Sequence, residues 1–180
     1  LTGGADKVAK IWDIGAGTCE TTFTFGSRQM GDQQNSVLWP RADLMISISL
    51  CGNINILDPA NPSKPKQVIQ GFQFLPMSLA RNGQTVVMGD SEGVVCVFDL
   101  ATGKASKVRG QDASSQAGAV HTTQVTGLAV MGGDKIVSAA MDKTLTVSSL
   151  SELTALETVE LPSWPESLAG SDGNGVVAVL

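Results

Sequence analysis

A repeat of roughly 45 residues is the feature that most constrains the fold of this 180-residue chain. Each copy has a turn position, then an alternating strand that ends six residues later, then a short polar turn. The turn positions are 6, 51, 92 and 142, which gives spacings of 45, 41 and 50 residues. Self-similarity at such a period is typical of solenoids, propellers and other repeat arrays.

Alternation of apolar and polar residues predicts three further strands in each complete copy. The predicted strands around the four frames are 20–25, 36–39, 44–49, 67–70, 77–80, 85–88, 104–108, 125–130, 135–139 and 156–161. Residues 148–159 place three leucines at helical spacing, but the frame favours a loop and an outer strand there. The chain is therefore predicted to be all-β, with about four WD40-type β-propeller blades that are each a four-stranded antiparallel sheet.

In such blades, a Trp at the strand end donates its indole N–H to a Ser or Thr hydroxyl, and a His connects that hydroxyl to the turn Asp. Trp12 and Asp6 have this spacing, with Thr2 as the hydroxyl. The expected structural positions are Asp6, Trp12, Asp13, Glu92, Phe98, Asp99, His121 and Asp142. Leu57, Phe98 and Ser148 take the Trp position in the other copies and lack an indole donor. Apolar packing is therefore expected to hold most blades.

Within this repeat, the chain begins at the second strand of one blade. Its last segments, 166–169 and 175–180, supply only the first and second strands of another. About four blades cannot close a seven-bladed ring, so we expect the chain to be a piece of a longer protein. Each end blade would expose an apolar sheet face. Self-association of the isolated chain is the expected result.

The sequence presents no catalytic, cofactor or metal constellation. His121, the one histidine, lies in the loop before a first strand, where WD repeats place a structural His. Residues Gly15–Glu20 lack the third glycine of a dinucleotide-binding loop and precede a strand rather than a helix. Residues Ser171–Gly175 are expected to form a β-turn. These patterns predict a protein that is not an enzyme and has no cofactor.

Charge and cysteine content exclude other classes. The formal net charge is −5 and the 12 Lys and Arg are scattered, which disfavours a nucleic-acid partner. No apolar run approaches the roughly 20 residues needed to span a bilayer, so no membrane partner is expected. Three widely spaced cysteines without C-x-x-C, and no signal-peptide pattern, favour the cytoplasm.

Several aromatic residues are open to two interpretations. Trp39 and Trp164 each precede a proline, and each could pack at a blade rim or anchor a partner. Phe72, Phe74 and Leu75 form an apolar cluster in a connecting loop, with the same two interpretations.

One segment is more specific than the general repeat. Within residues Asp32–Gly71, the distinctive features are Asp32-Gln33-Gln34, Ser47-Ile48-Ser49, Gly52-x-Ile54-Asn55, Asn61-Pro62-Ser63-Lys64-Pro65 and Val68-Ile69-x-Gly71. This segment resembles the actin-interacting protein 1 family, WD-repeat proteins that promote actin filament disassembly together with cofilin. The flanking frames follow the order of blades in that family, although Phe72 stands where a His is usual.

The resemblance implies two seven-bladed propellers. Residues 1–70 would be the last blades of the first propeller and 71–180 the first blades of the second; the alternative is one continuous array over 1–180. Actin filaments and cofilin would be the partners, at the cytoskeleton. The partner-binding candidates in this chain are Asp32, Gln33, Gln34, Trp39 and Trp164. Two other functions remain open: a general propeller adaptor for protein complexes, and a propeller enzyme with a channel metal.

Overall fold

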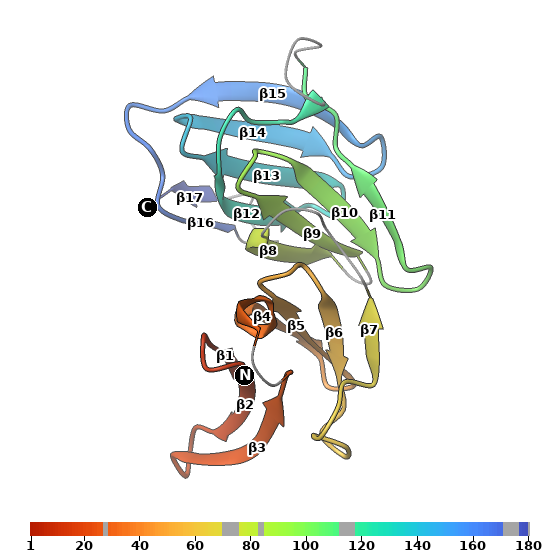
Figure 1. Ribbon diagram of the computed structural model, residues 1–180. Helices are drawn as coiled ribbons and strands as arrows, with labels where there is room; N and C mark the ends of the chain where they lie inside the picture. The colour runs from red at the N-terminus through yellow and green to blue at the C-terminus, as the bar shows by residue number, and fades with distance from the viewer. Residues whose placement is uncertain (27–28, 70–75, 83–84, 112–117, 171–176, 180) are drawn as a thin grey trace. The chain divides into compact units, whose positions relative to one another are not determined.

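The structure is a computed structural model that describes residues 1–26, 29–69, 76–82, 85–111, 118–170 and 177–179 (Figure 1). Within this part, the chain consists of short antiparallel strands and one 3₁₀ turn. It divides into two compact units, Leu1–Pro76 and Met77–Leu180. The cluster at Phe72, the 70/71 boundary and the turn at Ser171–Gly175 lie outside the described residues.

The first unit contains two sheets, each with its strands in chain order. The three-stranded sheet consists of β1 (Thr2–Gly3), β2 (Val8–Asp13) and β3 (Thr18–Thr24). The four-stranded sheet consists of β4 (Gln34–Arg41), β5 (Leu44–Ser49), β6 (Ile54–Leu57) and β7 (Gln67–Ile69). A 3₁₀ turn, η1 (Met30–Asp32), precedes β4.

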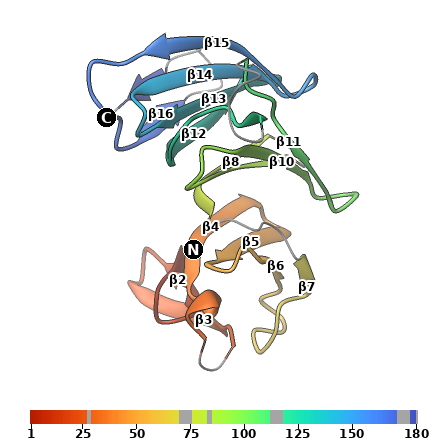
Figure 2. The same ribbon diagram turned by 45° about the horizontal axis from the view of Figure 1, so that its top comes forward.

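The second unit contains two complete four-stranded sheets and one strand pair, which Figure 2 shows from a second angle. The first sheet consists of β8 (Pro76–Asn82), β9 (Thr85–Asp90), β10 (Val95–Asp99) and β11 (Lys104–Lys107). The second consists of β12 (Val125–Met131), β13 (Lys135–Ala140), β14 (Thr144–Ser149) and β15 (Thr154–Glu160). The pair is β16 (Leu168–Gly170) with β17 (Val177–Val179). The predicted four-stranded antiparallel blades are confirmed, including an outer strand rather than a helix before residue 161.

The turn between the second and third strands repeats one backbone conformation in all four sheets. The residues that follow the frame positions are Lys7, Gly52, Gly93 and Lys143, with φ of 65°, 85°, 81° and 65°. This left-handed conformation is easy for glycine and disfavoured for other residues. The period in the sequence is therefore also a period in the backbone.

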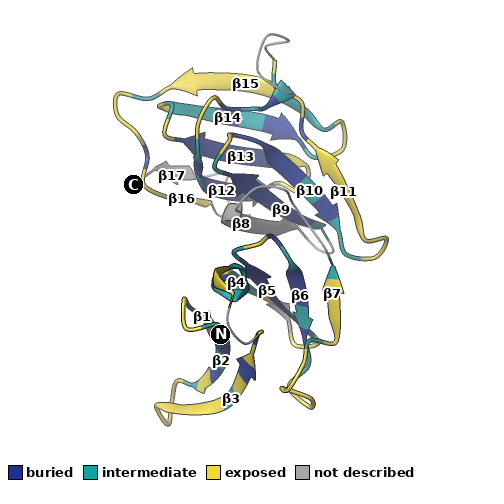
Figure 3. Cartoon of the chain, in the orientation of Figure 1, coloured by how far each residue is buried: buried dark blue, intermediate teal, exposed yellow. Residues whose placement is uncertain are grey.

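Burial follows the strand order within each sheet (Figure 3). All six residues of β5 are buried, whereas all four residues of the outermost strand β11 are exposed. Strand β5 therefore contributes to the core, whereas β11 lies at the solvent edge of its sheet.

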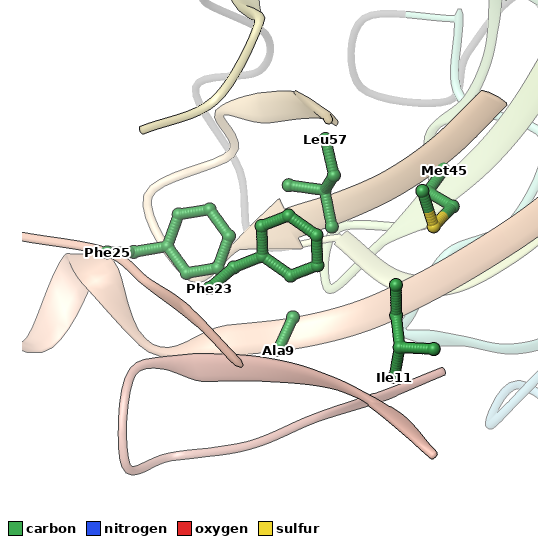
Figure 4. Close-up of a cluster of buried hydrophobic side chains, with 6 residues drawn as sticks. All are labelled: Ala9, Ile11, Phe23, Phe25, Met45 and Leu57. Atoms are coloured by element: carbon green, nitrogen blue, oxygen red, sulfur yellow. The ribbon is translucent and has the colours of Figure 1, made fainter. Parts of the chain in front are cut away.

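Each unit has its core between adjacent sheets. In the first unit, Phe23 and Phe25 meet Ala9, Ile11, Met45 and Leu57 (Figure 4). In the second unit, the core between β8–β11 and β12–β15 is formed by Val87, Val95, Val108, Val125, Leu128 and Ile136.

A glycine allows the next strand pair to approach closely in the second unit. A Cβ atom on Gly127 of β12 would lie 2.4 Å from Leu168 Cβ and 2.6 Å from the Leu168 backbone nitrogen. Position 127 therefore has no room for a side chain while β16 lies against β12.

Candidate functional site

The strand registers identify equivalent positions in the four sheets. The second-strand residues Thr2, Ser47, Met88 and Ser138 lie opposite Lys10, Asn55, Cys96 and Thr146. Each of these third-strand residues precedes the Trp position by two. The same site is therefore occupied by Thr, Ser, Met and Ser, and its partner changes from sheet to sheet.

In the first sheet, the predicted indole contact is present. Trp12 Nε1 donates a hydrogen bond to Thr2 Oγ1 at 2.8 Å, and Lys10 Nζ lies 5.6 Å from the centre of the indole ring. Trp12 is 41% exposed in this chain and Asp6 is exposed at the turn. The hydrogen bond between Trp12 and Thr2 therefore lies on a face of β2 that is exposed to solvent in this chain.

In the fourth sheet, His121 connects three strand or turn residues. Its Nε2 lies 2.7 Å from Ser138 Oγ, and its Nδ1 lies 2.8 Å from Thr144 Oγ1 and 3.4 Å from Asp142 Oδ2. Thr144 Oγ1 donates to Asp142 Oδ1 at 2.6 Å. Since the Thr144 hydrogen is used on the carboxylate, its oxygen accepts the Nδ1–H of His121.

The Asp142 carboxylate accepts from the backbone N–H groups of Thr122 at 2.8 Å and Thr144 at 3.0 Å. Burial by itself would raise its pKa, but hydrogen bonds from His121, Thr144 and Thr122 outweigh burial. They hold the pKa of Asp142 well below the ordinary value for an aspartate.

Although these residues make a Ser–His–Asp arrangement, it is closed to substrate. His121 is 2% exposed and Ser138 is fully buried. A nucleophile must reach a reacting carbon atom, which a buried hydroxyl between sheets cannot do. The arrangement is therefore structural, as the position of His121 in the loop before the first strand suggested.

Ser148 occupies the Trp position of this sheet, so the network lacks the indole N–H donor that Trp12 supplies in the first sheet. Its hydroxyl is buried and has no hydrogen-bond partner in the described part of the chain. Unlike Trp12, it does not extend the contact to the second strand. Ser138 Oγ instead lies 3.4 Å from the Thr146 carbonyl oxygen.

The second sheet contains a buried amide network that the sequence reasoning missed. Ser47 Oγ donates to Gln34 Oε1, and Gln34 Nε2 donates to the Asp32 carbonyl oxygen at 2.6 Å and to Ser49 Oγ at 3.2 Å. Asn55 Nδ2 donates to Ser49 Oγ at 3.0 Å. The Gln34 amide thus contacts the second-strand serine, as His121 does in the fourth sheet.

This network changes two expectations. Gln34 was a partner-binding candidate, but its side chain is buried and bonded internally, so it is not displayed to a partner. Apolar packing was expected to hold most blades, but the second and fourth sheets also have buried polar networks. Asn55 and the two serines alternate within the strands, which is the signal that could have indicated an internal network.

The third sheet is the most apolar at these positions. Met88, Cys96 and Phe98 are buried. Burial raises the pKa of the Cys96 thiol to about 11, with the Asp90 charge adding to the rise. Glu92 lies in the turn between β9 and β10, where it was expected, and is exposed. The buried Asp90 at the end of β9 accepts the Glu92 and Val94 N–H groups, both at 2.9 Å. Asp90 is therefore the carboxylate that caps this turn.

The turn after each third strand is capped by a side-chain oxygen. Asp13, Asp58 and Asp99 accept backbone N–H bonds from Ala16, Ala60 and Ala101. Ser149 does the same for Glu152 in the fourth sheet. Backbone N–H groups of Thr102 and Ala101 lower the pKa of Asp99. Asp13 and Asp99 are thus turn caps.

The exposed partner-binding candidates lie in two different units. In the first unit, Trp39 is 45% exposed. Asp32, the last residue of η1, and Gln33, which follows it, are half-buried. In the second unit, Trp164 is 60% exposed in the loop that Thr126 Oγ1 ties down through the Pro165 carbonyl oxygen at 2.8 Å. Each unit therefore exposes one of the two candidate indoles.

Other site types are not found among the described residues. That part of the chain contains no cluster of three or more His, Cys, Asp or Glu side chains suited to a metal. Across the same ranges, no helix has the length and apolarity needed to cross a bilayer. Cys19, Cys51 and Cys96 are free thiols.

Curated proteins with similar sequences match the full length of this chain. WD repeat-containing protein 1 of Gallus gallus is 35% identical over 186 residues, which cover 100% of this chain and 29% of that protein. Actin-interacting protein 1 of Drosophila melanogaster is 28% identical over 182 residues, 99% of this chain and 28% of that protein. The chain belongs to the actin-interacting protein 1 family. It spans less than a third of the length of these relatives.

Solved structures support the fold of this family member. The crystal structure of the WD40 β-propeller domain of Doa1 matches with a TM-score of 0.77 at 17% identity, covering 98% of this chain and 55% of that chain. At this identity the likeness shows the propeller fold alone. No protein-family model matches the sequence.

Proposed function

We propose that this chain is part of a non-enzymatic actin-regulatory protein that binds actin and cofilin and promotes filament disassembly. The observation that carries the proposal is similarity over the whole chain to WD repeat-containing protein 1 and Actin-interacting protein 1. The protein would act by binding one filament state more tightly than another, without covalent chemistry. It would do so in the cytoplasm, at the cytoskeleton.

Two features of the chain support binding rather than catalysis. Its one Ser–His–Asp arrangement is buried between sheets, and the surface instead displays the indoles of Trp39 and Trp164. Tryptophan is enriched at the centres of protein interfaces.

We further propose that residues 1–70 close a first propeller and residues 71–180 open a second. The division of the chain into compact units after Pro76 supports this arrangement. One continuous blade array is the alternative.

A pelleting assay tests the proposed function. Full-length protein is sedimented with actin filaments, with cofilin present or absent, and actin is quantified in both fractions. Actin should shift to the supernatant only when all three proteins are present. If the protein leaves actin in the pellet under both conditions, the function reverts to that of a general propeller adaptor.

The two exposed indoles can be tested in the same assay. Trp39→Ala and Trp164→Ala should each weaken the shift by several-fold if its indole anchors a partner. Ile14→Ala is the matched control, because Ile14 is 95% exposed and is not a candidate. Equal effects of the three variants would show that neither indole is an anchor.

A further inference from the structure

The turn before β15 carries a leucine where the matching turns of two other sheets carry glycine. The turns that precede β3, β11 and β15 have the same length, and their last residues are Gly17, Gly103 and Leu153. The φ angles of these residues are 68°, 70° and 55°. This left-handed conformation is easy for glycine and disfavoured for leucine, so the surroundings of Leu153 must hold it there.

The Leu153 side chain packs where the two glycines have open space. A Cβ atom built on Gly17 or Gly103 would have no atom of the described residues within 4 Å. Leu153 is half-buried and packs, as Leu150 does, against the core between the third and fourth sheets, which includes Val108 just after β11. The turn of the fourth sheet therefore reaches the apolar core that it shares with the third sheet.

The backbone at Leu153 makes a second contact with the neighbouring sheet. Arg109, which follows Val108, donates its N–H to the Leu153 carbonyl oxygen at 2.9 Å and accepts the Ala155 N–H at 2.8 Å. This parallel bridge joins the segment after β11 to the outer edge of β15 (Figure 1). Gln111 Nε2 also donates to a carbonyl oxygen of β15. Both the side chain and the backbone of Leu153 thus contact residues that follow β11.

The first half of the same turn is fixed from within its own sheet. The backbone carbonyl oxygen of Asp134 accepts the Leu150 N–H at 2.6 Å. The Asp134 carboxylate accepts the Ser151 N–H at 2.9 Å and the Ser149 hydroxyl at 3.1 Å. The turn is therefore held at both ends, and a disfavoured φ persists when the surrounding structure determines it in this way.

We propose that residues 150–153 form a latch that joins the third and fourth sheets at their outer edge, and that Leu153 is the residue that closes it. The closed latch keeps Arg109 on the start of the β15 edge, whose backbone groups would otherwise be open to pairing with another segment. The segment after β11 and the start of β15 should therefore open and close together. This inference does not depend on the proposed actin function.

The test is hydrogen exchange of the full-length protein, measured by mass spectrometry in peptides that cover residues 104–111 and 153–160. Leu153→Ala keeps the disfavoured backbone and removes the packed side chain, so exchange in both peptides should rise about tenfold. Leu153→Gly also relieves the backbone, so exchange should rise less but still exceed that of the parent protein. Leu153→Met keeps an apolar side chain of similar volume and should exchange as the parent does.

Leu156→Ala is the matched control, because it deletes the same side chain from an exposed position of β15. It should leave exchange unchanged, and the peptide that covers β5 should remain slow in every variant. Three results would overturn the proposal: exchange in Leu153→Gly that is no faster than in the parent, faster exchange in residues 153–160 alone, or faster exchange that extends to β5.

Discussion

At the scale of single residues, one register position determines which interactions stabilise each sheet. Trp12 reaches a second-strand hydroxyl with its indole, whereas Ser148 at the equivalent position leaves its own hydroxyl without a partner. His121 nevertheless still bonds the second-strand serine in the fourth sheet. A degenerate repeat can therefore keep a buried network after the residue that usually completes it is lost.

Asp142→Asn should destabilise the chain by about 1–3 kcal/mol. An asparagine has one acceptor oxygen, so it can no longer accept from both Thr122 and Thr144 as the two carboxylate oxygens do. Urea denaturation at pH 7 measures the loss. Asp99→Asn removes a carboxylate from an exposed turn and should cost less; an equal loss in both variants would contradict the central role of Asp142.

The cost of Asp142→Asn should also depend on pH. Hydrogen bonds lower the pKa of Asp142 in the folded chain, so the unfolded chain binds more protons on acidification. The stabilisation by the carboxylate is therefore complete above the unfolded pKa of about 4, and it decreases as pH falls towards the lower folded pKa. The stability difference between parent and variant should shrink below about pH 4.

At the scale of elements, the contact between successive blades depends on backbone approach as much as on apolar side chains. β16 can lie against β12 because Gly127 has no side chain, and Gly89 similarly leaves room for Val125. Overpacking at Gly127 forces backbone movement, because the nearest atoms include main-chain atoms of Leu168.

Gly127→Ala should therefore destabilise the second unit by about 1–3 kcal/mol, even though alanine usually gains stability through the unfolded state. The midpoint of urea denaturation measures the change. Gly15→Ala is the control, because a Cβ atom there would meet only Asp13 Oδ1 at 3.3 Å. A neutral Gly127→Ala would mean that β16 does not pack against β12 in solution.

At the scale of the whole molecule, the two compact units bear on the proposed pair of propellers. In a repeat array, the interfaces between neighbouring repeats contribute to stability, so a destabilised blade also destabilises the next one. Two separate propellers would confine the effect to one unit.

Phe23→Ala distinguishes these cases, since Phe23 is in the core of the first unit and is 1% exposed. The loss should be about 3–5 kcal/mol. Hydrogen exchange should then accelerate only in residues 1–69, and Phe98→Ala should accelerate it only in the second unit. Faster exchange in both units for either variant would favour one continuous array.

The sequence by itself determined the strands, the turns and their period. Alternation and turn residues act over a few positions, so the frame at 6, 51, 92 and 142 could be found without coordinates, and the left-handed residues after each frame position confirm it. The segment Asp32–Gly71 was also sufficient for the family, because its distinctive residues lie close together in the chain.

Only the tertiary structure decided which polar side chains meet. The hydrogen bond between Gln34 and Ser47 joins residues 13 apart, and the contact between His121 and Thr144 joins residues 23 apart. Such pairs depend on strand register and on the packing of one sheet against the next, which residue spacing does not encode. For the same reason, Gln34 could be taken for a surface residue, and the capping of the Glu92 turn by the buried Asp90 could not be foreseen.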